Sequence, residues 1–179
     1  MKELNITSAT RADLPAILNL QKKAFLEVAR AFNLKSLPPL EQTLDSLTDE
    51  FKNGIILKAL FANTPTVKHD RANQFLDTGL RPYDNDDAII VGSVRAYQKE
   101  DTCHIGRLVV LPEYQNQGIG KALMREIEHQ YQGIVKRFEL FTGMNDSRNR
   151  HLYDHLEYKP FKSEKLNDDV TFVYLEKSV

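Results

Sequence analysis

The segment from residue 108 to residue 128, LVVLPEYQNQGIGKALMREIE, limits the possible folds more than any other part of the chain. Val109 and Val110 suit a buried strand, and Gly118 and Gly120 precede an amphipathic helix. The first N–H groups of a helix have no partners within the helix, and the helix dipole adds positive potential there. We therefore predict that backbone amides at this turn bind a diphosphate without a dedicated charged side chain.

Two common phosphate-binding motifs do not fit these residues. A Walker loop requires glycine at the position of Gln115 and Ser or Thr at the position of Ala122. A dinucleotide fingerprint requires glycine at the position of Leu123. The order Q-x-x-G-x-G, formed by Gln115, Gly118 and Gly120, remains. An ordinary strand–turn–helix connection that uses its glycines only for tight turning is the alternative interpretation.

The hexapeptide QNQGIG, preceded by the run RLVVLPEY, resembles the acetyl-CoA signature of the GNAT superfamily of N-acetyltransferases. The resemblance implies that acetyl-CoA is a co-substrate and that its binding residues at the turn are Gln115, Asn116, Gln117, Gly118, Ile119, Gly120 and Lys121. It also implies that backbone amides near Val109 or Val110 polarise the carbonyl oxygen of the thioester.

A second segment, residues 139–161, resembles the family pattern of a strand followed by a helix that carries S-x-N and L-Y. The resemblance implies that Tyr153 is the general acid, because the equivalent tyrosine lies beside the sulfur of CoA, and a phenol with a reference pKa near 10 can protonate a thiolate. Asn149 is four residues earlier on the same helix face and is expected to contact the pantetheine arm. Glu157 replaces the usual glycine, which predicts either backbone strain or a changed helix cap.

The base that deprotonates the amine is the least defined part of the site. Many relatives carry a glutamate on the fourth strand where this chain has Arg107. The remaining candidates are Glu27, Glu50, Glu113 and His104, acting directly or through a water. We select His104, because the reference pKa of imidazole is near 6.5. Arg107 indicates either a carboxylate-bearing substrate or a solvated arginine at a strand end.

The sequence order predicts a mixed α/β domain. Strands are expected over residues 3–9, 55–61, 88–97, 102–111, 136–142, 158–163 and 170–177, and helices over 10–32, 40–53, 121–130 and 147–156. The resemblance implies a GNAT-like, mostly antiparallel sheet that is flanked by helices and splayed between its fourth and fifth strands. We predict one domain over residues 1–179, with a mobile surface insertion at about 63–87 that borders the substrate site.

Other chemistries fit poorly. His151 and His155 have a spacing that can hold zinc, but Leu152 follows His151 where H-E-x-x-H has Glu, and no third ligand is evident. The acidic run at 84–87 lacks the glycine and distal glutamate of a calcium loop. Cys103 lies in an apolar strand, where a thiol is inert. We expect no metal.

Composition and charge limit the partners. The formal net charge of -1 provides no long-range attraction to nucleic acid or anionic lipid. We find no apolar run that approaches the roughly 20 residues of a membrane span and no signal-peptide core, and the single Cys103 cannot form an internal disulfide. We therefore expect a cytoplasmic monomer or homodimer with no nucleic-acid or membrane partner.

These observations favour an N-acetyltransferase that transfers acetyl from acetyl-CoA directly to a primary amine of a small molecule or a protein. A non-catalytic acyl-CoA sensor remains the alternative, because no base is identified with certainty from the residues. A structural adaptor whose turn binds no cofactor is a more distant alternative.

Overall fold

The computed structural model of the chain describes residues 3–31, 37–62, 88–166 and 170–179. The strands are β1 (Leu4–Ser8), β2 (Ile55–Ala62), β3 (Ala88–Lys99), β4 (Thr102–Val110), β5 (Arg137–Gly143), β6 (Lys159–Lys165) and β7 (Thr171–Ser178). The helices are α1 (Leu14–Ala31), α2 (Pro38–Glu41), α3 (Leu44–Asn53), α4 (Ile119–Gln130) and α5 (Ser147–His155), with short 3-10 turns η1 (Arg11–Asp13) and η2 (Pro112–Tyr114). The insertion predicted at 63–87 lies outside the described residues. None of the helices described combines the length and apolar character that a membrane span requires.

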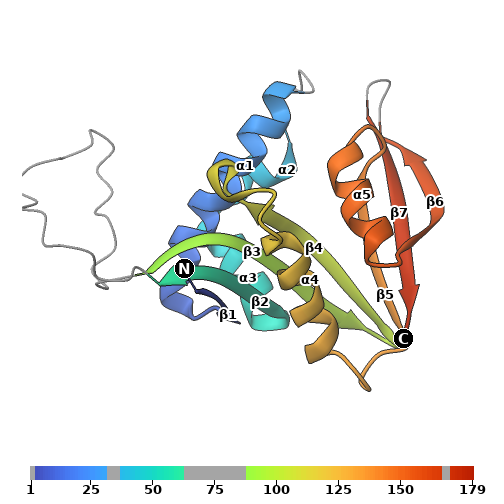
Figure 1. Cartoon of the computed structure of the whole chain (residues 1–179), viewed down its shortest axis with the longest axis horizontal. Coiled ribbons are helices and arrows are strands. Elements are labelled where there is room, and N and C mark those ends of the chain that lie inside the picture. Colours follow the sequence, from blue (N-terminus) through green and yellow to red (C-terminus); the bar gives the residue numbers. More distant parts are fainter. Residues whose placement is uncertain (1–2, 32–36, 63–87, 167–169) are drawn as a thin grey trace, which may run out of the picture.

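The strands form one sheet in the order β1-β2-β3-β4-β5-β7-β6. Neighbouring strands are antiparallel except β4 and β5, which are parallel. Figure 1 shows α4 and α5 in front of this sheet and α1 and α3 behind it. The sheet therefore separates two layers of helices, and each layer has its own cluster of buried apolar side chains.

The first helix begins at the predicted position because Thr10 and Asp13 form a capping box. The backbone N–H and the hydroxyl of Thr10 each donate to Asp13 Oδ2 at 2.7 Å. Lys58 on β2 donates to the same oxygen at 2.7 Å. The start of α1 is thus tied to the sheet by a mostly buried ion pair.

The single second helix predicted over 40–53 is divided into α2 and α3. Gln42 has a ψ of 134°, which is outside the helical range, and Thr43 then caps α3 by accepting a hydrogen bond from Ser46 N at 3.2 Å. The Gln42 side chain is buried and contacts polar groups of α1 and β3. A tertiary polar contact has replaced the local helical continuation that the apolar spacing predicted.

The predicted splay lies between β4 and β5. These strands pair only where Thr102, Cys103 and His104 face residues 137–139, and the pairing stops at Ile105. Figure 1 shows β4 and β5 converging near the C-terminus and diverging toward their other ends. One edge of β4 is therefore directed into a wedge-shaped opening in the middle of the sheet.

β4 contains a bulge close to the point where it separates from β5. On β3, Ser93 pairs with Val109 and Arg95 pairs with Gly106. Two residues of β4, Arg107 and Leu108, therefore lie opposite the one residue of β3 between these pairs, Val94. Arg107 has a φ of +54°, in the left-handed region. The bulge turns the Arg107 side chain toward the α1 and α3 face of the sheet, where it lines two adjoining cavities.

Candidate functional site

The turn before α4 leaves the helix N-terminus without a side-chain cap. Gly118 is the N-cap residue with a φ of +79°, a left-handed conformation that favours glycine, and Asn116 has a φ of +61°. The first helical backbone bond runs from Ala122 N to Gly118 O, so the N–H groups of Ile119, Gly120 and Lys121 come before it. No acidic side chain lies in this first turn. The turn therefore has the geometry and the positive potential of an anion site.

Gln115 joins this turn to its two neighbours. Its Nε2 donates to Val110 O at 3.0 Å, at the end of β4, and its Oε1 accepts a hydrogen bond from Arg148 on α5. The side chain of the first residue in the Q-x-x-G-x-G pattern thus holds the turn in position relative to β4 and α5. Gln117 is exposed and donates to Glu113 O at 3.4 Å.

The first turn of α4 lies close to α5 at Gly120, where a small side chain would also fit. A Cβ atom added at Gly120 would stand 3.4 Å from Leu152 Cδ2 and 3.8 Å from Leu108 Cδ2. Ile119 is buried in the larger apolar cluster, and Lys121 is half-buried. The turn is thereby held against the helix that carries the predicted acid.

The backbone amides of Val109 and Val110 point in opposite directions. Leu111 N donates to Val91 O at 2.8 Å, and Val109 pairs with Ser93. Because N–H groups alternate along a strand, the Val109 N–H points toward β3 and the Val110 N–H points toward the opening between β4 and β5. Of the two predicted carbonyl donors, Val110 is the one that faces the opening.

Tyr153 lies on α5 inside the larger apolar cluster and is 5% exposed. Burial, and secondarily the Asp146 carboxylate, raises the pKa of its phenol above the ordinary value. Its hydroxyl makes no hydrogen bond within the described part of the chain. Asn149, one turn earlier, uses its side-chain amide to donate to Asp146 Oδ2 at 2.7 Å, so it also stabilises the start of α5.

A cavity of about 640 Å³ lies on the opposite face of the sheet. It is bounded by α3, the first residue of β2, β3, β4 and one residue of β5, and its lining includes Asp49, Glu50, Arg95, Tyr97, His104, Gly106, Arg107 and Phe141. A second cavity of about 270 Å³ adjoins it and shares Ser46, Glu50 and Arg107. Together they provide a site of the size that small ligands occupy.

A buried arginine organises the floor of this cavity. Arg95 is 6% exposed and donates to Glu50, to Gln21 and, at 3.0 Å, to Gln42. Burial lowers the pKa of Arg95, and the hydrogen bond and charge of Glu50 oppose that shift. Its Nε is buried without a hydrogen-bond partner. Sequence analysis missed this network, although a charged residue within the apolar run AIIVGSVRAY was a signal for it.

His104 lies at the last paired position before β4 and β5 separate. Its ring stacks on Tyr97 with centroids 5.0 Å apart, and its Nδ1 is 3.8 Å from Glu139 Oε1. The side chain is 26% exposed and lines the larger cavity. The imidazole is thus held by an aromatic ring and a carboxylate at the apex of the opening.

The structure separates the four candidate bases into two groups. Glu27 pairs with Arg30, and Glu113 pairs with Lys23; both carboxylates are more than half exposed, and neither lines the cavities described. Glu50 and His104 line the larger cavity together. The geometry therefore retains only these two as candidates.

Cys103 is fully buried, and burial raises the pKa of its thiol to about 12, which disfavours the nucleophilic thiolate. The rings of His151 and His155 are tilted by 60° relative to each other, with centroids 4.1 Å apart. Across the described ranges, no group of three or more His, Cys, Asp or Glu side chains is arranged to hold a metal ion.

Comparison with known proteins gives a family match. Residues 40–158 match the profile of the acetyltransferase (GNAT) family. No curated protein sequence matches with statistical significance.

Solved structures share the fold over almost the whole chain. PaiA N-acetyltransferase from Thermoplasma acidophilum, solved with coenzyme A, has a TM-score of 0.69 and 16% identity, covering 99% of each chain. The ribosomal-protein-S18-alanine N-acetyltransferase from Escherichia coli has a TM-score of 0.67 and 12% identity, covering 98% of this chain and 94% of that chain. An Elizabethkingia anophelis acetyltransferase with acetyl-CoA bound has a TM-score of 0.63 and 16% identity, covering 98% of each chain.

Proposed function

The chain belongs to the acetyltransferase (GNAT) family, and from this premise we propose that it transfers acetyl from acetyl-CoA directly to a primary amine. The observation that carries the proposal is the uncapped N-terminus of α4 beside a sheet that opens between β4 and β5. The turn supplies backbone donors for a diphosphate, and in our proposal the arm of CoA lies along the unpaired edge of β4. One protein from this fold group was solved with CoA and another with acetyl-CoA, which supports the same ligand here.

Acetyl-CoA fits the residues that are present. The N–H groups of Ile119, Gly120 and Lys121 would hold the diphosphate, and a Cβ atom added at Gly118 would meet nothing within 4 Å, so the turn is open to a ligand. The bound thioester supplies an acetyl group activated for attack by an amine. In our proposal the Val110 N–H, which faces the opening, donates to the carbonyl oxygen as negative charge develops on it.

The reaction we propose is a single displacement through a tetrahedral intermediate. The amine nitrogen attacks the acetyl carbon from the larger cavity, the carbon–sulfur bond breaks, and the thiolate accepts the phenolic proton of Tyr153. Burial keeps Tyr153 protonated, and the same core raises the pKa of Cys103 to about 12. A thiolate released into such surroundings is likewise more basic than in water, so transfer of the proton from the phenol is feasible.

His104 is our proposed base for the proton that the amine loses. Glu50 already accepts hydrogen bonds from Arg95 and from Gln42 Nε2 at 2.7 Å, so its oxygens are engaged. Among the residues described, the closest carboxylate to the imidazole of His104 belongs to Glu139, at 3.8 Å, which is longer than a hydrogen bond. His104 also lies on the strand that carries Val110 and faces the acceptor cavity. The acceptor itself is a small-molecule or protein amine.

A thiol-release assay with acetyl-CoA and a panel of primary amines tests the proposal. We expect CoA release that depends on the amine, together with the mass increase of an acetyl group on the acceptor. CoA binding without turnover by any amine would instead identify an acyl-CoA sensor. If CoA also fails to raise the melting temperature, the turn binds no CoA and the proposal is wrong.

A further inference from the structure

Arg107 is a cation at the junction of the two cavities, and no residue among those that the structure describes pairs with it. It lines both of them, and the bulge in β4 directs it there. No hydrogen bond or ion pair joins its guanidinium to another residue in the part of the chain that the structure describes. The N–H donors of this guanidinium are therefore available to a ligand in the cavity.

The other charges around the larger cavity are already matched. Arg95 and Glu50 are bonded to each other, and Asp49 pairs with Lys52 at 2.9 Å on the exposed side of α3. Arg107 is the cation of this cavity that lacks a bonded counter-charge. Burial, and then the proximity of Arg95, lowers the pKa of Arg107, while Glu50 acts in the opposite direction. A partly desolvated guanidinium beside a second guanidinium is a favourable position for an anion.

We propose that the acceptor carries one carboxylate in addition to its amine, and that Arg107 binds this carboxylate through its guanidinium. The proposal deepens the proposed function and rests on it, since it concerns the acceptor side of the same site. A planar guanidinium donates two parallel hydrogen bonds to a carboxylate, which also orients the bound molecule. Tyr97 and Phe141 give the larger cavity aromatic walls for the part of the acceptor between its amine and its carboxylate.

The charge balance favours a carboxylate over a phosphate monoester. One unmatched guanidinium balances a single negative charge. Glu50 at the same junction is already matched by Arg95, so a second negative charge on the ligand would have no cation to balance it. The inferred acceptors are therefore amino acids and similar amino carboxylic acids.

The test compares matched acceptor pairs that differ only in the carboxylate. We would measure kcat/KM by thiol release for glycine, phenylalanine and γ-aminobutyrate, each against its amide, at about pH 8, and express each value per concentration of unprotonated amine. We expect the acid to be the better acceptor in at least one pair by about 10-fold or more. If every amide equals or exceeds its acid, the proposal is wrong. O-Phosphoethanolamine is added as a phosphate acceptor, and its preference over all three acids would also overturn the proposal.

Variants of Arg107 test whether this side chain causes the preference for the acid over its amide. Arg107→Gln should lower kcat/KM for the preferred acid by about 30-fold or more and leave the amide unchanged, because loss of a desolvated charge pair costs about 2 kcal/mol or more. Arg107→Lys should retain part of the preference, since it keeps the charge and loses the planar fork. The matched control is Arg125→Gln on the exposed surface of α4, which should change neither substrate. Equal losses for acid and amide in Arg107→Gln would show a structural role and overturn the proposal.

Binding measurements test the carboxylate site independently of the proposed reaction. If no amine releases thiol, the proposed function fails, and calorimetric binding of the same three acids to the CoA-saturated protein then decides the carboxylate site. Binding that is lost in Arg107→Gln and retained in Arg125→Gln supports the site. Absence of binding by all three acids overturns it.

Discussion

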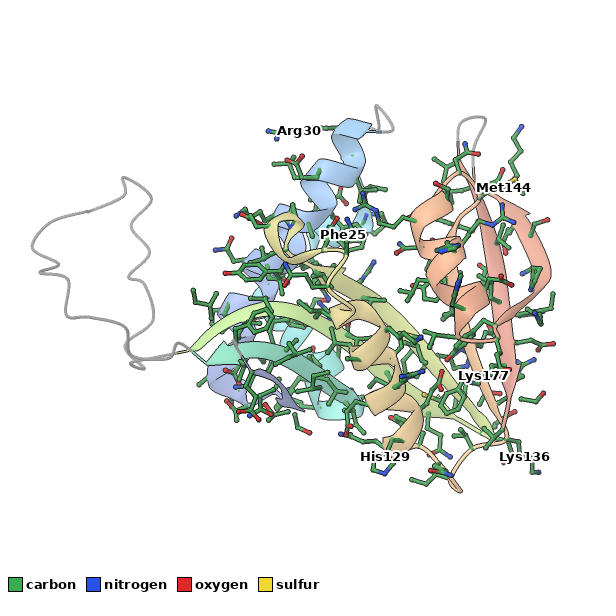
Figure 2. All side chains as sticks on the ribbon, viewed as in Figure 1. Phe25, Arg30, His129, Lys136, Met144 and Lys177 are labelled. Atoms are coloured by element: carbon green, nitrogen blue, oxygen red, sulfur yellow. The ribbon has the colours of Figure 1, made fainter. Side chains whose placement is uncertain are left out.

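The rings of Tyr153 and Tyr158 lie 6.1 Å apart at an interplanar angle of 59°, and both are buried in the larger apolar cluster. Their hydroxyl groups differ in environment. The Tyr158 hydroxyl is fully buried beside the Glu128 carboxylate, which with burial raises the pKa of Tyr158, whereas the carboxylate that raises the pKa of Tyr153 is Asp146. Figure 2 labels Lys177, whose Nζ donates to Glu128 Oε2 at 2.7 Å across the space between β7 and α4.

Tyr153→Phe removes the proposed proton donor without changing the packing of the ring. We expect kcat to fall by about 100-fold or more, because general acid catalysis commonly contributes that factor. The affinity for acetyl-CoA should change little, since the hydroxyl acts when the thiolate leaves. Steady-state kinetics combined with calorimetric titration of CoA checks both quantities. A loss of affinity as large as the loss in kcat would mean that Tyr153 serves binding alone.

Tyr158→Phe is the matched control for this experiment. It removes a phenolic oxygen from the same cluster, one that lies beside the Glu128 carboxylate and has no part in the proposed reaction. We expect unchanged kcat, and the melting temperature measures any effect of the substitution on the core. A drop in kcat similar to that of Tyr153→Phe would indicate general damage to the core.

Gly118→Asp tests the diphosphate site and Gly133→Asp controls for its effect on the backbone. Gly118 and Gly133 have left-handed φ values of +79° and +75°, and an added Cβ meets nothing within 4 Å at either position. Both substitutions should therefore destabilise the fold by about 1–2 kcal/mol. Only Gly118→Asp puts negative charge at the α4 N-terminus, so it alone should abolish CoA binding, as measured by calorimetry. Unchanged CoA affinity in Gly118→Asp would refute the assignment of the turn.

Local signals in the sequence predicted the element order and the turn. Gly118 and Gly120 follow an apolar strand, and the helix predicted over 121–130 is present there as α4, which begins two residues earlier. Thr10 and Asp13 likewise marked the start of α1 by their spacing. The overall fold and the splay between β4 and β5 came from the resemblance of these motifs to a family, and both are confirmed. Structural features that depend on residues close together in the sequence could therefore be predicted.

Features that depend on contacts between distant elements were not predicted. Gln42 interrupts the second helix because its buried side chain meets Gln21 and Arg95, which come from α1 and β3. The bulge at Arg107 depends on the register of β4 against β3. Neither contact leaves a periodic signal in the chain, so neither the acceptor cavity nor its charges could be derived before the strands were placed.

Glu157→Gly should stabilise the protein. Glu157 has a φ of +70° at the end of α5, where Tyr158 N donates to Tyr153 O and Glu157 N donates to Asp154 O, both at 3.0 Å. These two bonds form a Schellman motif, in which glycine avoids the strain of a left-handed residue. We expect a gain of about 0.5–1 kcal/mol, after the added freedom of the unfolded chain is counted. Glu157→Ala keeps the strain and should show no such gain in thermal unfolding, and equal gains in both variants would contradict a backbone origin.

His104→Gln tests the proposed base. At neutral pH we expect kcat to fall by about 100-fold, whereas raising the pH toward the pKa of the acceptor amine should restore activity, because the amine then loses its proton without help. A pH–rate profile measures this recovery, and a purely structural defect would not show it. His129→Gln, on the largely exposed side of α4, is the control. If Glu50→Gln reproduces the pH recovery and His104→Gln does not, the base is Glu50.

Asp13→Asn should destabilise the protein in a pH-dependent way. Burial alone raises the pKa of Asp13, but hydrogen bonds from Lys58 and Thr10 outweigh it, and the pKa in the folded protein is lower than usual. The stabilisation is therefore present above the unfolded pKa near 4 and is lost as the pH falls through the folded pKa.

We expect Asp13→Asn to lower the free energy of unfolding by about 1–3 kcal/mol at pH 7, and the difference from wild type to shrink below about pH 4. Urea unfolding at several pH values measures it. Asp101→Asn breaks an ion pair whose side chains are 83% and 66% exposed and should cost far less, because solvent screens that pair. A difference for Asp13→Asn that stays constant down to pH 2 would show that the carboxylate charge contributes nothing and that the loss comes from the cap geometry alone.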